Sequence, residues 1–154
     1  MGYMSGDQSS LRARLRVPLL PVWVRGSIVI VTLGVVLYYS IVPAPGSGSL
    51  VTGPFGLLPY STWLHVLAYT GLTIVFAYTT AHVKQAKWRH LTVVFVVVVT
   101  VGIIIEMVQY TLPTRSFSWV DIATNTAATS IGLLIWAALD HITQFYRVDN
   151  HNAS

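Results

Sequence analysis

The stretch "EMVQYTLPTRSFSWVDIATN", residues 106–125, places two carboxylates between two strongly apolar runs. The chain has five acidic residues among 154, and Glu106 and Asp121 are two of them. An ionised carboxylate is costly in apolar surroundings unless other groups compensate its charge. Both side chains therefore need partners, which the rest of the sequence has to supply.

The composition indicates a membrane protein, because 54% of the residues are hydrophobic and only 9% are charged. The formal charge of +4 does not predict nucleic-acid binding, since the basic residues lie in short segments between apolar runs. No cysteine is present, which excludes disulfides and thiolate chemistry. The HExxH spacing of a zinc site is also absent, and we expect neither a metal nor a cofactor.

Four apolar runs are long enough to cross about 30 Å of hydrocarbon as helices. We therefore predict an all-α, multi-pass protein of the cell membrane with four transmembrane helices. The runs cover roughly residues 23–42, 60–81, 90–112 and 119–139.

The basic residues predict the orientation of these helices. Eight of the nine lysines and arginines lie near the start of the first run, between the second and third runs, or after the fourth run. Only Arg115 lies in the segment between the third and fourth runs, on the other side of the membrane. Positive residues accumulate in cytoplasmic segments, so both termini are expected in the cytoplasm. The predicted organisation is a basic cytoplasmic segment (1–22), a four-helix transmembrane domain (23–139) and a short cytoplasmic tail (140–154).

A short external turn is predicted between the third and fourth helices. Pro113 disfavours helical backbone at the residue before it, so the third helix should stop near Leu112. Ser118 and Asp121 have the spacing of a capping box, which predicts that the fourth helix begins at Trp119. Helices joined by so short a turn are antiparallel neighbours.

The turn brings polar side chains to matching depths on the two helices. Gln109 and Asp121 lie about 4.5 Å from it, and Glu106 and Asn125 lie about 10 Å from it. His65 lies at a similar depth in the second helix, so we expect Glu106 and Asn125 to approach one another near His65. Simpler roles stay open for each residue, namely a helix cap, an ion pair or a hydrogen bond between helices.

Tyr69 lies one turn below His65 and either joins this cluster or belongs to the ordinary core. Arg115 either binds an anion or contacts a lipid head group nonspecifically. Ala128 and Gly132 are expected to be small packing residues without a further function. We expect every ionisable side chain within the spans to lie in the outer third, and none in the inner half.

The quoted stretch resembles the signature of the VanZ-like family of small membrane proteins. The matching positions are Glu106, Gln109, Arg115, Asp121 and Asn125, and "HVLAY" resembles the histidine and tyrosine of the family's second span. The family often carries an aspartate and a lysine before that histidine, where this chain has Ser61 and Thr62. The resemblance implies a link to resistance against the glycopeptide teicoplanin, for which the family is named.

We therefore expect an outward-facing polar cluster that binds the polar or anionic head group of a lipid or an envelope precursor. The expected ligand-binding residues are His65, Tyr69, Glu106, Gln109, Arg115, Asp121 and Asn125. One alternative is a membrane-embedded enzyme that acts on a lipid-linked head group, with Glu106 or His65 as general base. Another is a structural four-helix subunit, and a homo-oligomer is compatible with each of these functions.

Overall fold

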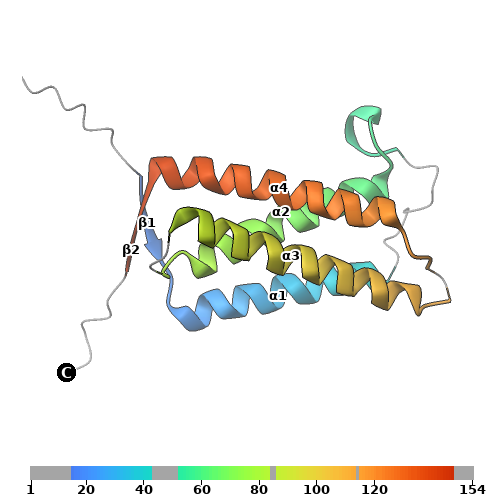
Figure 1. Cartoon of the computed structure of the whole chain (residues 1–154), viewed down its shortest axis with the longest axis horizontal. Coiled ribbons are helices and arrows are strands. Elements are labelled where there is room, and N and C mark those ends of the chain that lie inside the picture. Colours follow the sequence, from blue (N-terminus) through green and yellow to red (C-terminus); the bar gives the residue numbers. More distant parts are fainter. Residues whose placement is uncertain (1–14, 43–51, 84–85, 114, 148–154) are drawn as a thin grey trace, which may run out of the picture.

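The computed structural model describes residues 15–42, 52–83, 86–113 and 115–147. Its main feature is a bundle of four antiparallel helices (Figure 1). Each helix agrees with a predicted apolar run to within three residues at both ends. The helices are α1 (Val22–Ile41), α2 (Tyr60–Thr80), α3 (Lys87–Tyr110) and α4 (Trp119–Ile142).

The bundle has two different ends. At the turn end, α1 and α3 finish while α2 and α4 begin. At the terminal end lie two short strands, β1 (Leu15–Leu19) and β2 (Thr143–Arg147) (Figure 1). Helix α2 packs against each of the other three helices, whereas α1 and α4 lie on opposite sides of the bundle.

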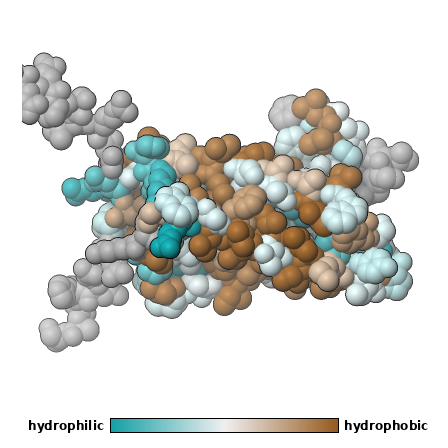
Figure 2. Space-filling view, viewed as in Figure 1, coloured by the Kyte–Doolittle hydropathy of each residue, from teal (hydrophilic) through white to brown (hydrophobic). Residues whose placement is uncertain are grey.

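Three helices, α1, α3 and α4, are long and apolar enough to cross a membrane. Only 17% of the apolar window of α1 and 28% of those of α3 and α4 are buried inside the bundle. Most of the apolar side chains therefore face outward, and the middle of the bundle has a largely hydrophobic surface (Figure 2). An apolar surface of this extent fits a protein that lipid surrounds.

Helix α2 differs from the others because it is less apolar, and it is not among the helices that meet the hydropathy criterion. Its serine, threonine and histidine side chains lower its hydropathy. Four of its residues are buried against its neighbours, namely Tyr69, Leu72, Thr73 and Ala77. One of these polar residues, Thr73, donates its hydroxyl to the Tyr69 carbonyl of the same helix at 2.6 Å.

Small residues allow α2 and α4 to approach closely. Ala128 is fully buried, and its carbonyl accepts a hydrogen bond from Thr70 Oγ1 at 3.2 Å. A methyl group built on Gly132 would lie 2.8 Å from Thr73 Cβ and 3.0 Å from the Thr70 carbonyl. The prediction that Ala128 and Gly132 are packing residues is therefore confirmed.

The terminal end contains a two-stranded sheet that the sequence analysis did not predict. β1 and β2 pair in parallel, with Leu15 opposite Thr143 and Leu19 opposite Arg147. An isolated pair of strands is only marginally stable. Here the Tyr78 hydroxyl of α2 donates to the Pro18 carbonyl at 3.0 Å and so ties the sheet to the bundle.

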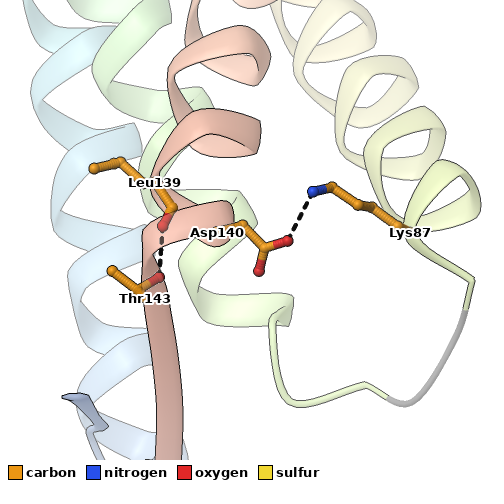
Figure 3. A network of polar contacts seen from close by, with 4 residues as sticks. All are labelled: Lys87, Leu139, Asp140 and Thr143. Carbon is orange, nitrogen blue, oxygen red and sulfur yellow. Dashed lines mark hydrogen bonds and ion pairs between the residues drawn. The ribbon is translucent and has the colours of Figure 1, made fainter. Parts of the chain in front are cut away.

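An ion pair and a buried arginine also stabilise the terminal end. Lys87 Nζ lies 2.9 Å from Asp140 Oδ2, which joins the start of α3 to the last turn of α4 (Figure 3). Arg25 is only 2% exposed and donates from Nη1 to the carbonyl of Thr79 at 3.0 Å. A cation at this position interacts favourably with the unsatisfied carbonyls at the end of α2.

The prediction that the inner half of the bundle has no ionisable side chain is therefore wrong. Arg25, one of the eight basic residues that predict the orientation, lies within the first turn of α1 and is buried. His90 also lies in α3, with Nε2 2.7 Å from Thr80 Oγ1. Both side chains find their partners near the end of α2, which the sequence analysis treated only as an apolar span.

Candidate functional site

The connection between α3 and α4 has the local structure that its sequence predicts. Helix α3 ends at Tyr110, and α4 begins at Trp119 with Ser118 as its N-cap. The Ser118 hydroxyl accepts a hydrogen bond from the backbone N–H of Asp121 at 3.1 Å. This contact is the serine half of a capping box and confirms the predicted start of α4.

The acid that completes the cap comes from the neighbouring helix. In an ordinary capping box, the acid three residues later accepts from the backbone N–H of the N-cap residue. Here the Ser118 N–H donates to Glu106 Oε1 at 2.6 Å, so that α3 caps α4. The N-terminus of a helix carries partial positive charge, which favours a carboxylate. The 1% exposed Glu106 is thus compensated mainly by the backbone.

The predicted partners of Glu106 are only partly correct. Among residues 15–42, 52–83, 86–113 and 115–147, Lys87–Asp140 is the only ion pair within 4.0 Å. Glu106 therefore forms no ion pair with Arg115, although Arg115, His65 and Asp121 all lie close enough to interact with it electrostatically. The four groups share one neighbourhood, as the matched depths predicted.

His65 forms a hydrogen bond with Asn125, one of the two residues that were expected near it. Its Nδ1 lies 2.9 Å from Asn125 Oδ1, which joins α2 to α4 through a hydrogen bond. The His65 ring also stacks on Tyr69, with ring centroids 6.3 Å apart and an interplanar angle of 4°. This contact agrees with the prediction that His65 lies at the level of Asn125, while the approach of Glu106 to Asn125 stays a prediction.

Gln109 connects α3 to α1, a contact that sequence reasoning missed. Its Nε2 donates to the carbonyl of Ser40 at 2.7 Å, and both residues are buried. The Ser40 hydroxyl is used within its own helix, where it donates to the Val36 carbonyl. Because the acceptor is a backbone oxygen at the end of a helix, no side-chain pattern could have identified it.

A cavity of about 490 Å³ lies between α1 and α2 and extends toward the turn end. Four of the seven predicted site residues line it: His65, Tyr69, Gln109 and Arg115. The other three, Glu106, Asp121 and Asn125, do not. Two of the four lining residues, His65 and Gln109, also join helices through their hydrogen bonds to Asn125 and Ser40.

Two polar atoms at this cavity lack hydrogen-bond partners within the described part of the chain. One is the hydroxyl of Tyr69, a residue that is 1% exposed and whose ring packs against Gly102 of α3. The other is Nε of Arg115, which is buried although the residue as a whole is half-buried. Leaving a buried donor unsatisfied costs about 1–3 kcal/mol. Both atoms are themselves shielded from the cavity, which their residues line with other atoms.

Two residues that a catalytic site could use already have hydrogen-bond partners. The Ser118 hydroxyl accepts the helix-capping hydrogen bond from Asp121, and His65 Nδ1 is paired with an amide rather than a carboxylate. In the part of the chain with described coordinates, no three histidine, aspartate or glutamate residues could together hold a metal ion. The cavity is lined mainly by apolar side chains, with the cationic Arg115 near the turn end.

Comparison with known proteins agrees with this assembly of residues. The sequence profile described as VanZ/LLP1 matches residues 4–140, which include all four helices up to Asp140. No curated protein and no solved structure matches the chain. Because the match extends over most of the sequence and includes the capped turn between α3 and α4, the chain belongs to the VanZ/LLP1 family.

Proposed function

We propose that the protein binds an anionic head group at the turn end of the bundle, with Arg115 as the principal contact. The guanidinium is always charged and presents several donors in a planar fork, which suits phosphate and carboxylate groups. His65, Tyr69 and Gln109 line the same cavity and supply further polar contacts.

The observation that carries this proposal is a cationic residue, Arg115, at the polar end of a cavity that His65, Tyr69 and Gln109 also line. The Arg115 Nε and the Tyr69 hydroxyl are both buried, and neither has a partner within the described chain. Both residues line the cavity between α1 and α2 through other atoms. Arg115 forms no ion pair within 4.0 Å among the described residues, so its positive charge favours a negatively charged ligand.

Glu106 and Asn125 act as positioning residues in this proposal, and Asp121 contributes its charge to the first turn of α4. Glu106 fixes the start of α4 through the Ser118 N–H, and Asn125 fixes the His65 ring through its amide oxygen. These hydrogen bonds hold the connection that carries Arg115 and the ring that borders the cavity. Some of the predicted site residues would thus contact the ligand, and others would hold those contact residues in position.

The membrane placement is a further part of the proposal. All four helices cross the cell membrane, and the eight-to-one distribution of basic residues places both termini in the cytoplasm. The turn end then faces outward, where head groups of outer-leaflet lipids and lipid-linked envelope precursors are found. Capture of such a group would connect the chain to the teicoplanin resistance for which the family is named.

Arg115→Lys tests the proposal because it keeps the positive charge and removes the planar fork. The protein is purified in mild detergent, incubated with phosphatidylglycerol or phosphatidylcholine, and analysed for retained lipid by mass spectrometry. We expect wild type to prefer the anionic lipid. Arg115→Lys should retain about tenfold less phosphatidylglycerol, or less still, because it loses a charge-assisted hydrogen bond of about 1.5–3 kcal/mol.

Arg89→Lys is the matched control, since Arg89 is exposed at the opposite end of the bundle, near the start of α3. It should retain phosphatidylglycerol as wild type does, and thermal unfolding in detergent should be unchanged for both variants. Equal retention by wild type and Arg115→Lys would overturn the proposal and favour a purely structural role for the polar cluster.

A further inference from the structure

The cavity between α1 and α2 is much deeper than a head-group site requires. Along α1 its lining runs from Ser40 to Val31, which is nine residues or about 14 Å of helix. Along α2 it runs from Ser61 to Leu72, which is eleven residues or about 16 Å. It therefore reaches about halfway through a hydrocarbon layer of about 30 Å.

The chemistry of the lining changes with depth. Near the turn end it includes the side chains of Ser61, Gln109 and Arg115. Farther along α1 and α2 it is dominated by apolar residues such as Val31, Val35, Leu67 and Leu72, and the hydroxyl of the deep-lying Thr32 is satisfied by the Ile28 carbonyl. The cavity is thus amphipathic along the direction of the helices, like a lipid in the surrounding leaflet.

The cavity is open at its side. Val31, Val35 and Leu67 line it and are 64%, 50% and 64% exposed. Gly71 also lines it and is exposed, and a methyl group built there would meet no atom within 4 Å. The opening lies at the depth of the apolar surface of the bundle, where acyl chains rather than water would be its neighbours.

We propose that this cavity binds a lipid whose hydrocarbon chain lies between α1 and α2 and whose anionic head group reaches Arg115. The lipid enters sideways from the membrane, so a soluble head group without a chain is not the ligand. The inference rests on the proposed head-group function and adds a requirement for the chain.

Gly71→Leu tests the requirement for the chain, because its new side chain projects into the open space at the cavity wall. Gly34→Leu is the matched control, since Gly34 is also an exposed helical glycine with no atom within 4 Å of an added Cβ, and it does not line the cavity. Both changes replace glycine by a better helix former, so the helices should remain folded. Val35→Trp fills the cavity from the α1 side as a second variant.

The measurement is the phosphatidylglycerol retained by the detergent-purified protein, with glycerol phosphate added as a competitor that lacks acyl chains. We expect Gly71→Leu and Val35→Trp to lower phosphatidylglycerol retention by at least about tenfold, because each new side chain occupies space that the acyl chain would fill. Gly34→Leu should retain the lipid as wild type does. Glycerol phosphate at equal concentration should not displace the lipid.

The possible failures are distinguishable. Normal retention in both cavity-filling variants, together with loss in Arg115→Lys, would overturn the chain site and leave the head-group proposal standing. Loss in the cavity-filling variants with normal retention in Arg115→Lys would remove the head-group proposal and leave an apolar lipid site. Full displacement by glycerol phosphate would show that the head group alone is bound, as a free anion.

Discussion

At the scale of single residues, Glu106 explains why this apolar chain contains an acid at that depth. Its carboxylate accepts the Ser118 N–H at 2.6 Å, while the Ser118 hydroxyl accepts the Asp121 N–H at 3.1 Å. Two of the unsatisfied donors at the start of α4 are thereby paired, one of them by a residue twelve positions earlier in the chain. The acid is therefore a structural partner of α4 as well as a neighbour of Arg115.

The size of the Glu106 contribution can be measured with two substitutions. Glu106→Ala leaves the Ser118 N–H without its acceptor and should lower the free energy of unfolding by about 1–3 kcal/mol. Glu106→Gln keeps an acceptor oxygen but loses the charge, which roughly halves the strength of such a bond, so its loss should be smaller. Unfolding of the detergent-solubilised protein by sodium dodecyl sulfate would give both values.

Asp121→Asn is the control for this comparison. The Asp121 side chain only contributes charge to the first turn of α4, which is worth about 0.3–1 kcal/mol. A loss for Asp121→Asn as large as that for Glu106→Ala would contradict the capping role of Glu106.

At the scale of the elements, the close contact between α2 and α4 depends on small residues of α4. Helices in lipid gain little from the hydrophobic effect and associate through close packing and hydrogen bonds. Gly132 and Ala128 of α4 face Thr73 and Thr70 of α2, and their small size permits the hydrogen bond to the Ala128 carbonyl. The same contact aligns His65 with Asn125 one level nearer to the turn end.

Gly132→Ala should disturb this contact. The added methyl would lie 2.8 Å from Thr73 Cβ and 3.0 Å from the Thr70 backbone oxygen, and neither atom can move without shifting α2. Overpacking of this kind typically costs about 1–3 kcal/mol of stability. The midpoint of thermal unfolding in detergent should therefore decrease.

Gly34→Ala provides the comparison, because an added methyl on this residue of α1 meets nothing within 4 Å. Its stability should be unchanged or higher by up to about 1 kcal/mol, as expected when alanine replaces glycine in a helix. If the two alanine variants unfold at the same temperature, the close approach of α2 and α4 at Gly132 is not significant for stability.

At the scale of the whole molecule, the two ends of the bundle have different structures. The turn end carries the capped connection, the Arg115 guanidinium and the polar part of the cavity. The terminal end carries the sheet, the Lys87–Asp140 ion pair and the buried Arg25. In the proposed orientation the first of these ends faces the exterior and the second faces the cytoplasm.

Single cysteines test this orientation, since the natural chain has none. Ser116 is exposed at the turn end and Gln144 is exposed on β2. In intact cells, an impermeant thiol reagent should label Ser116→Cys and spare Gln144→Cys, which should be labelled only after the membrane is permeabilised. The reverse pattern, or labelling of both variants in intact cells, would be incompatible with the proposed topology.

The sequence by itself determined the four helices, the start of α4 at Ser118 and the gathering of the seven polar residues near one turn. These features follow from local rules, namely the length of apolar runs, the backbone restriction imposed by Pro113 and the spacing of a capping box. They also include the packing role of Gly132, because small residues repeat on one face of α4.

Only the tertiary structure decided which polar groups pair. Glu106 accepts a backbone N–H and Gln109 donates to the Ser40 carbonyl. Backbone donors and acceptors occur at every position, so a side-chain pattern cannot identify them as partners. His65 bonds to the Asn125 side chain, and this pairing depends on how α2 and α4 pack. The sheet, the burial of Arg25 and the cavity between α1 and α2 likewise depend on how distant segments meet. Side-chain spacing fixes depth within one helix, whereas the rotation and separation of neighbouring helices arise from packing of the whole bundle.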